Sequence, residues 1–305
     1  MASNLNWELY RTFLAVLTEG SLSGAARALG ITQPTAGRHV AALEEAFGQP
    51  LFTRSPAGFL PTEAARALRG YAESMRSTAA ALERAASGQG NAMRGVVRIT
   101  ASEVVSVEVL PPVLAALRRA HPQIVVELVP SNRLQDLLQR EVDIAVRMTA
   151  PQQDMLIARR IGDIEIGLHA RDDYLAEHGT PQSITDLAQH ALIGYDTVTP
   201  FVRAASCALP YWKRESFALR TDSDVAQLAM LRAGCGIGVC QVGVARRDAR
   251  LQRVLPRECA VKLTTWIAMH EDLRGNKRCK AVFDALASGL EAYIAQAGGN
   301  QAERY

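Results

Sequence analysis

From Val96 to the end of the chain, apolar segments of strand length alternate with amphipathic segments of helix length. This alternation is typical of parallel α/β units, in which helices connect the strands. Because the strands are too many for one small sheet with short loops, we expect two subdomains, residues 91–165 with 265–295 and residues 166–264. The strand-like segments are residues 96–100, 125–129, 143–148, 164–170, 191–195, 216–221, 236–242 and 264–270.

Residues 1–62 have a different pattern, with Ala-rich helical segments that each end at a glycine. Ser23 and Thr32 stand where side-chain oxygens can cap the second and third segments, and Pro34 falls in a first turn that needs no backbone donor there. Two helices joined by a tight Gly-containing turn predict a helix-turn-helix. The following stretch, LFTRSPAGFLPTEA, indicates a short extended wing, after which Thr62 can cap another helix.

Residues 63–87 predict one long helix with a heptad seam of alternating large and small side chains. We therefore expect residues 63–90 to form a dimerisation helix and hinge, although a helix lying on its own domain would show the same pattern. The seam consists of Ala65, Leu68, Ala72, Met75, Ala79, Leu82 and Ala86.

The third helical segment opens with Thr32, Gln33, Pro34 and Thr35 and becomes apolar only after Arg38 and His39. Short polar and small apolar side chains at a helix N-terminus suit the donors, acceptors and thymine methyls of the DNA major groove. A solvated helix face would look similar. Residues 1–90 hold eight Arg and seven Glu with no Lys or Asp, a net charge of +1, so any DNA binding must depend on placement and dimerisation rather than on bulk charge.

Catalytic and metal-binding patterns are absent from the sequence, so we expect no enzyme activity, no cofactor and no metal. There is no P-loop, HExxH or GxSxG motif, and none of the five Cys is part of a CxxC pair. Cys235 and Cys240 could form a redox pair, but their apolar, Gly-rich surroundings favour buried, inert thiols. No apolar run approaches the roughly 18 residues of a membrane span, which predicts a cytoplasmic protein without membrane contact.

One continuous stretch, GSLSGAARALGITQPTAGRHVAALEEAFGQPLFTRSPAGFLPTEAA, resembles the winged helix-turn-helix of LysR-type transcriptional regulators. The similarity continues through DIAVRM, LIARRIG and AGCGIGV, over nearly the whole chain. The resemblance implies a DNA-binding domain (1–62), a linker helix (63–90) and an effector-binding domain (91–305) with two subdomains like those of periplasmic binding proteins. It further implies a homodimer or homotetramer on a pseudo-palindromic promoter, and RNA polymerase as a partner if the protein is an activator.

Carried over by motif, the resemblance places Gln33, Pro34, Thr35 and Arg38 in the major groove, Ser23 on a phosphate and Arg54 of the wing in the minor groove. Two positions depart from the family pattern. Gly37 stands where a Ser is usual, which removes a phosphate contact and costs roughly 1 kcal/mol of helix propensity relative to Ala. Gln241 stands where a Pro is common.

A ligand of two α/β lobes belongs in the cleft between them, where strands end and helices begin. Thr100 and Ser102 lie at such a junction, and hydroxyls beside free N–H groups suit a carboxylate, although Glu103 next to them opposes an anion and each residue could equally be a helix cap. The resemblance adds Ser131, Thr149, Thr199 and Phe201. We therefore expect a small anionic effector. The rival interpretation is a cytoplasmic solute-binding or enzymatic α/β protein whose N-terminal helices mediate protein contacts.

Overall fold

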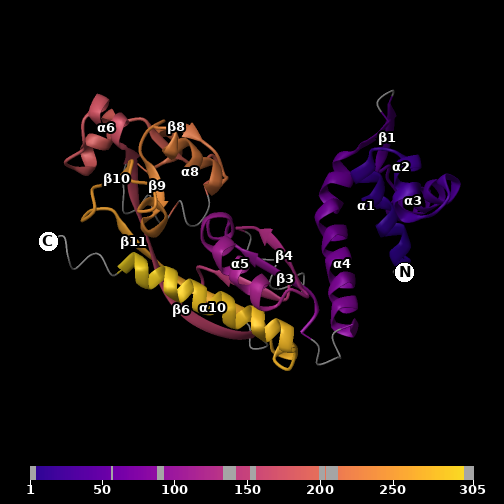
Figure 1. Ribbon diagram of the computed structural model, residues 1–305. Helices are drawn as coiled ribbons and strands as arrows, with labels where there is room; N and C mark the ends of the chain where they lie inside the picture. Colours follow the sequence, from indigo (N-terminus) through magenta and orange to yellow (C-terminus); the bar gives the residue numbers. More distant parts are fainter. Residues whose placement is uncertain are drawn as a thin grey trace. The chain divides into compact units, whose positions relative to one another are not determined.

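The structure, a computed structural model, describes residues 5–55, 58–87, 93–132, 142–151, 156–198, 203 and 212–298. The chain forms two compact units, one up to Ser87 and one that contains the described residues from Met93 onward (Figure 1). Each unit has its own hydrophobic core. No helix among the described residues is long and apolar enough to cross a membrane.

The first unit begins with three short helices around one small core. They are α1 (Trp7–Glu19), α2 (Leu22–Leu29) and α3 (Gln33–Phe47). Each ends at a glycine, namely Gly20, Gly30 and Gly48, whose φ angles of 66°, 66° and 67° lie in the left-handed region. Phe13, Val16, Ala25, Val40, Leu43 and Leu51 are among the buried residues that pack together between the helices. The predicted helix-turn-helix is thus confirmed.

A two-stranded wing and a long helix complete this unit. The strands β1 (Phe52–Ser55) and β2 (Gly58–Pro61) pair antiparallel, with Phe52 opposite Pro61 and Arg54 opposite Phe59. The helix α4 (Glu63–Ser87) starts where the sequence predicted, because the hydroxyl of Thr62 accepts the N–H of Ala65 at 3.2 Å.

The second unit contains two lobes. The first lobe has three parallel strands in the order β5-β3-β4. A π-helix, η1, and a helix, α5, connect β3 to β4. The elements are β3 (Gly95–Ala101), η1 (Val105–Val109), α5 (Leu110–Ala120), β4 (Ile124–Pro130) and β5 (Ile144–Arg147).

The second lobe holds a small parallel sheet of β7 and β8, with further strands and short helices around it. Its own core includes the buried side chains of Trp212 and Phe217, whose rings meet edge to face. The elements are α6 (Asp172–His178), η3 (Ile184–Gln189), β7 (Leu192–Gly194), η4 (Arg214–Ser216), β8 (Phe217–Arg220), α8 (Asp224–Arg232), β9 (Gly238–Gln241), α9 (Val242–Ala245) and β10 (Leu251–Val254).

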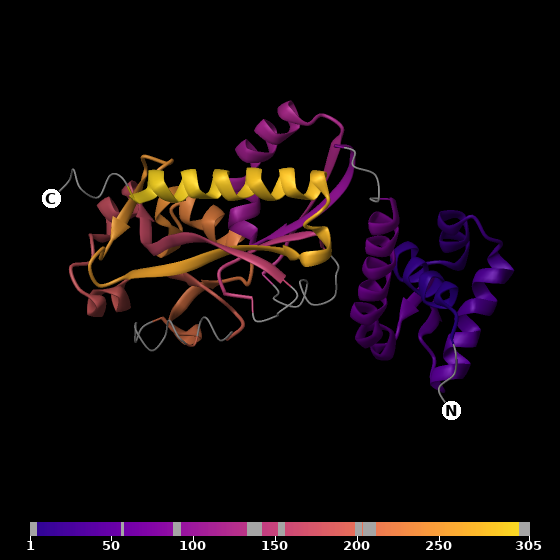
Figure 2. The same cartoon turned by 90° about the horizontal axis from the view of Figure 1, so that it is seen from below.

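Two long antiparallel strands, β6 (Leu156–Arg171) and β11 (Ala260–His270), run through both lobes and join them. In the first lobe β11 pairs with β5, and in the second lobe β6 pairs with β9 and β10. The register of β6 on β11 shifts by one residue between Thr265 and Trp266, next to Gly162 with φ 154°. After η5 (Glu271–Leu273), the last helix, α10 (Lys277–Gly298), lies along these strands (Figures 1 and 2).

The expectation of parallel α/β units was therefore only partly right. Among the described residues, the parallel strand pairs are β3 with β4, β3 with β5 and β7 with β8, with one further parallel bridge between Leu192 and Ile237, whereas β6 pairs antiparallel with β9, β10 and β11. The physical reason is that β6 leads from the first lobe into the second and β11 leads back. Because the two strands lie side by side in the same sheet, they run in opposite directions. The sequence also gave no indication of β10.

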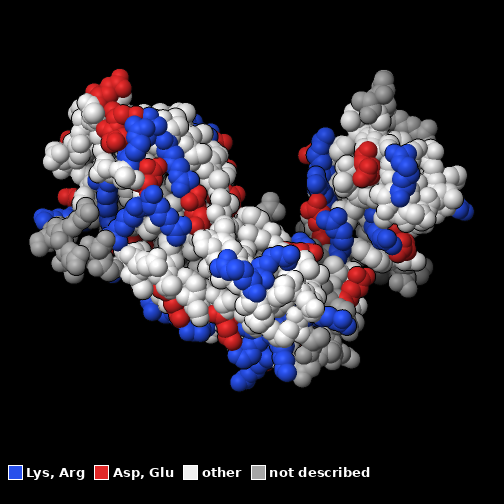
Figure 3. Space-filling view, viewed as in Figure 1, with Lys and Arg blue, Asp and Glu red and all other residues white. Residues whose placement is uncertain are grey.

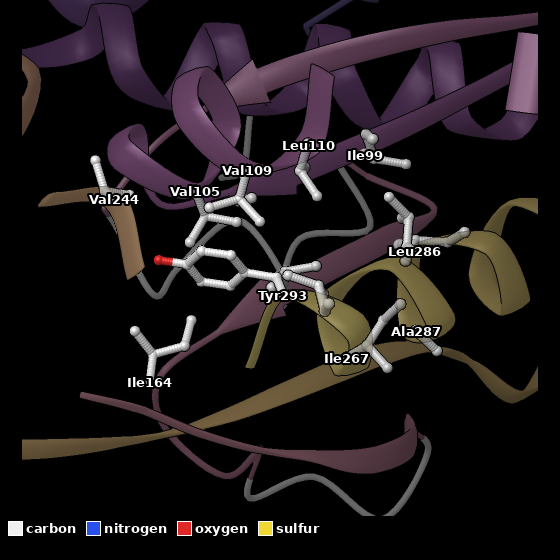
Figure 4. Packing of buried hydrophobic residues seen from close by; sticks show 14 of the residues in the cluster. Ile99, Val105, Val109, Leu110, Ile164, Val244, Ile267, Leu286, Ala287 and Tyr293 are labelled. Atoms are coloured by element: carbon white, nitrogen blue, oxygen red, sulfur yellow. The ribbon is translucent and has the colours of Figure 1, made fainter. Parts of the chain in front are cut away.

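The core of the first lobe is closed by Tyr293 of α10, which points toward Val105 and Val109 of η1 and Val244 of α9 (Figure 4). Its hydroxyl donates a hydrogen bond to Oε1 of Gln241 at 2.9 Å, and burial raises the pKa of this phenol. Gln241, where the resemblance led us to expect Pro, is thus a buried polar partner that ties β9 to α10.

Candidate DNA-binding face and effector cleft

The N-terminus of α3 presents a polar surface to solvent. Thr32 is the N-cap, since its hydroxyl accepts the N–H of Thr35 at 3.4 Å, and Pro34 lies in the first turn. Thr32, Gln33 and Pro34 are exposed, and Thr35 is half-buried. Both sequence expectations for this turn, the cap and the proline, are confirmed.

Arg38 lies one turn further along α3 on the same surface and is exposed. Its Nη2 donates to the hydroxyl of Thr35 at 3.3 Å, and the hydroxyls of Thr35 and Thr32 are 2.8 Å apart. Two hydroxyls and a guanidinium are therefore held together on the outer face of the helix.

His39, the next residue, points the other way. Its Nδ1 lies 2.8 Å from the hydroxyl of Thr12, a residue of α1 that is fully buried. Because that hydroxyl already donates to the carbonyl of Glu8 at 2.8 Å, Nδ1 of His39 must carry the proton and donate. The ring joins α3 to α1.

Ser23 does not cap α2 as the sequence predicted. The cap is Ser21, whose hydroxyl accepts the N–H of Gly24 at 3.0 Å. The chain is already extended at Ser21, with φ −154° and ψ 150°, so the helix begins at Leu22 and Ser23 lies half-buried within its first turn.

The base of the wing is fixed by Glu44 near the end of α3. Its Oε1 accepts the backbone N–H groups of Leu51 at 2.8 Å and Phe52 at 3.1 Å. The wing strand that carries Arg54 thus starts from a carboxylate anchor. This role of Glu44 was not predicted from the sequence, although a carboxylate in the last turns of a helix opposes the helix dipole and so indicates a specific partner.

Charge on the first unit is interspersed. On the face seen in Figure 3, basic side chains form small separate groups with acidic ones between them. This agrees with the net charge of +1 for residues 1–90 and means that no broad basic surface dominates the visible face.

In the second unit, the strands of the first lobe end together at one edge. Ser102 follows β3, Ser131 follows β4 and Thr149 comes soon after β5. The backbone N–H of Ser131 donates to the carbonyl of Ala101 at 2.9 Å, so the ends of β3 and β4 are joined. Thr149 is exposed, and the two serines are half-buried.

Thr100 is less accessible, with 1% of its surface exposed. Its hydroxyl donates to the carbonyl of Val129 at 2.8 Å and accepts from Nη2 of Arg147 at 2.9 Å. Nη1 of Arg147, a buried residue, also donates to the carbonyl of Val146 at 3.0 Å. Thr100 therefore holds a buried guanidinium at the end of β5 instead of lying open in the cleft.

The strand ends of the second lobe lie opposite those of the first. Tyr195 follows β7, and Ser223 caps α8 after β8. Thr199 and Phe201, which the resemblance adds to the effector site, lie outside the described residues.

Four polar side chains join the strand ends of the two lobes. Oε2 of Glu103 accepts from the hydroxyl of Ser223 at 2.8 Å, and Oδ1 of Asn132 accepts the N–H of Glu103 at 3.2 Å. Nδ2 of Asn132 in turn donates to Oδ2 of Asp224 at 2.9 Å. Of these four, only Glu103 was singled out from the sequence. Asn132 comes shortly after β4, and Ser223 and Asp224 come shortly after β8, positions that could have indicated them.

Asp224 is placed so that its charge is disfavoured. Tyr195 donates to its Oδ1 at 2.8 Å, but burial, with the nearby charge of Glu103, raises the pKa of the Asp224 carboxyl. Burial likewise raises the pKa of Tyr195, with Asp224 contributing.

The other end of α8 is also bonded to the first lobe. Arg232 donates two hydrogen bonds to the carboxylate of Glu108 in η1, at 2.7 and 2.9 Å. The bonds from Arg232 lower the pKa of Glu108. A π-helix is rare and often lies at a functional site.

The cysteines differ from one another. Cys240 is buried in β9, and burial raises the pKa of its thiol to about 12, in agreement with the expected inert thiol. Cys235, by contrast, is exposed, because it lies in the turn between α8 and β9; the prediction that its thiol is buried was wrong. In the described part of the chain, no three His, Cys, Asp or Glu residues are placed to hold a metal ion.

Comparison with known proteins agrees with this arrangement. The model of the LysR substrate binding domain matches residues 90–291, and the model of bacterial regulatory helix-turn-helix proteins of the lysR family matches residues 7–66. The chain therefore belongs to the LysR family of transcriptional regulators, DNA-binding proteins with an effector-binding domain rather than enzymes.

Among its relatives, the chain is 27% identical over 254 residues to the HTH-type transcriptional regulator CrgA of Neisseria meningitidis serogroup C, strain 8013, an alignment that covers 82% of this chain and 84% of CrgA. The fold is similar to a solved structure of Neisseria meningitidis CrgA, with a TM-score of 0.56, 24% identity and coverage of 94% and 99% of the two chains. It is also similar to full-length CbnR complexed with its target DNA, with a TM-score of 0.59, 18% identity and coverage of 92% and 99%.

Proposed function

We propose that α3 enters the major groove of promoter DNA in the cytoplasm and that the polar surface at its N-terminus reads the site. The observation that carries this proposal is the hydrogen-bonded set of Thr32, Thr35 and Arg38, held on the exposed face of α3. Gln33 and Pro34 contact bases, and the Arg54 strand of the wing reaches the minor groove. Ser23 lies near a phosphate, and His39 supports the helix from behind.

Dimerisation through α4 would place two such helices on a pseudo-palindromic site, with half-sites about 34 Å apart or a multiple of it. Tyr71, Met75 and Leu82 of α4 are large apolar side chains exposed by 74%, 41% and 72%. A second copy of the chain would cover them, and pairing of effector domains would make a tetramer. In an activator, this assembly would contact RNA polymerase.

The effector would be a small organic acid bound in the cleft between the lobes. Ser102, Ser131 and Thr149 place hydroxyl groups where β3, β4 and β5 end, and Thr100, close to Ser102 in the sequence, holds the buried guanidinium of Arg147. Binding would shift the relation of the lobes, and so change how the assembly bends its promoter.

Two experiments test these proposals. Binding of the full-length protein to its own promoter region, followed by fluorescence anisotropy and footprinting, should give a specific site whose extent or bend changes with saturating effector. A thermal-shift screen against small carboxylates, aromatic acids, amino acids and sugar acids should find the effector, because a ligand at a hundred times its Kd adds about 2.7 kcal/mol. A footprint unaltered by a ligand that the screen identified would contradict the proposed coupling.

A further inference from the structure

The helix α8 belongs to the second lobe, yet each of its ends is bonded to the segment that follows β3 in the first lobe. At its C-terminal end Arg232 pairs with Glu108, and at its N-terminal end Ser223 and Val225 bond to Glu103. The first lobe therefore contributes one carboxylate to each end of α8, and both carboxylates come from one short segment, residues 103–108.

At the N-terminal end, the carboxylate of Glu103 occupies the place that a bound anion would take. Its Oε2 accepts the hydroxyl of Ser223 at 2.8 Å and the backbone N–H of Val225 at 3.4 Å. The Ser223 hydroxyl also caps the helix by accepting the N–H of Ala226 at 3.3 Å. First-turn N–H groups and the helix dipole favour negative charge here.

The surroundings of this carboxylate make the contact easy to exchange. Asp224 is the next residue on α8, and its own charge repels that of Glu103. Asn132 holds both, through the N–H of Glu103 and Oδ2 of Asp224. The contact is thus well bonded but electrostatically opposed, in contrast to the paired charges of Arg232 and Glu108 at the other end.

We propose that Glu103 is an internal clasp, whose carboxylate holds the N-terminus of α8 while no effector is bound and is replaced there by the carboxylate of an arriving effector. On release, the lobes change their angle while the Arg232–Glu108 pair and the Asn132–Asp224 hydrogen bond still join them. The replacement step rests on the proposed function, since it requires an anionic effector. The contact of Glu103 with the N-terminus of α8 does not depend on that function.

Hydrogen exchange of the full-length protein, measured on peptides covering residues 222–227, tests the clasp without DNA or effector. In Glu103→Ala the amides of Val225 and Ala226 should exchange at least about tenfold faster, because a hydrogen bond to a charged group is lost. Added acetate or formate should restore protection in a concentration-dependent manner, whereas chloride at equal ionic strength should not. Glu103→Gln keeps an acceptor without its charge and should lie between the two.

The matched control is Glu127→Gln, which removes an exposed carboxylate of β4 that pairs with Arg98 and should leave α8 unchanged. Unaltered exchange in both Glu103 variants would overturn the clasp, and protection that acetate and formate fail to restore would overturn the replacement step. If Glu103→Ala does not fold, as judged by circular dichroism, Glu103→Gln carries the test. If the thermal-shift screen finds a carboxylate ligand but hydrogen exchange is unaltered in the Glu103 variants, the clasp is wrong and the proposed function still stands.

Discussion

The ring of His39 donates to the hydroxyl of Thr12 across 2.8 Å and so fastens α3 to α1 from the side opposite Arg38. His39 therefore stabilises the packing of α3 on α1, whereas Arg38 next to it is exposed, so substitutions of the two residues should have different effects. His39→Ala should lower the free energy of unfolding of the first unit by about 1 kcal/mol, measured by denaturant titration, because a part-buried hydrogen bond is lost.

Arg38→Ala should act on DNA binding instead. We expect a loss of roughly 1 to 3 kcal/mol in specific binding, measured by anisotropy on the promoter fragment, with little change in unfolding. Arg11→Ala, which removes an exposed arginine paired with Glu8 on α1, is the charge-matched control. Equal losses for Arg11→Ala and Arg38→Ala would mean that only overall charge matters.

Glu44→Ala should disturb the wing. Loss of the carboxylate leaves the N–H groups of Leu51 and Phe52 without their acceptor, so the free energy of unfolding should fall by roughly 1 to 3 kcal/mol and DNA binding should weaken. Glu45→Ala, an exposed neighbour in the same turn, should change neither quantity by a comparable amount. A Glu44→Ala protein as stable as the wild type would show that the anchor is dispensable.

Gly37 offers a test of the departure from the family pattern. A Cβ there would meet only Cδ1 of Leu22, at an ordinary 3.7 Å, so both Gly37→Ala and Gly37→Ser should fit and the alanine should stabilise α3 by about 0.5 to 1 kcal/mol. Only the serine should also tighten DNA binding, through a new phosphate contact. Equal affinities of the two variants would argue against that contact.

His169 should make the second unit less stable in acid. The ring is 2% exposed, its Nδ1 lies 3.0 Å from the carbonyl of Gly167, and burial lowers its pKa to about 4. The unfolded chain takes up a proton near pH 6.5 and the folded chain does not, so stability falls as the pH drops from 6.5 to 4, by about 3 kcal/mol in total. Denaturant titrations followed by tryptophan fluorescence should show a shallower pH slope in His169→Gln; identical slopes would assign the effect to other groups.

Gly289 lets α10 approach α5 closely. A Cβ at this position would lie 2.3 Å from Cγ2 of Val113, whose branched side chain has few alternatives, so Gly289→Ala should lower the free energy of unfolding by roughly 1 to 3 kcal/mol. Gly298→Ala is the control, since no atom would lie within 4 Å of the added Cβ. A stable Gly289→Ala protein would mean that the two helices separate easily.

Local signals were sufficient to predict much of this molecule. Gly20, Gly30 and Gly48 end their helices, and Thr32 and Thr62 cap theirs, because each choice depends on a few neighbouring residues. The eight predicted strands from Val96 onward all exist, since apolar runs of that length are recognisable by themselves.

What the sequence could not reveal depends on residues far apart in the chain. The antiparallel course of β6 and β11 follows from their pairing across about a hundred residues, which periodicity does not encode. Likewise, Glu103 meets Ser223 only because two lobes close on each other. The opposite orientations of Arg38 and His39 depend on where α1 lies.

The slipped pairing between β6 and β11 has a mechanical consequence. A two-stranded ribbon of continuous backbone cannot lengthen, and its ladder of hydrogen bonds resists sliding of one strand past the other, but it twists readily where a bulge interrupts that ladder. Here the interruption lies beside Gly162 and Thr265, about midway along the ribbon. We therefore expect a ligand bound between the lobes to change the angle at which they lie more than the distance that separates them.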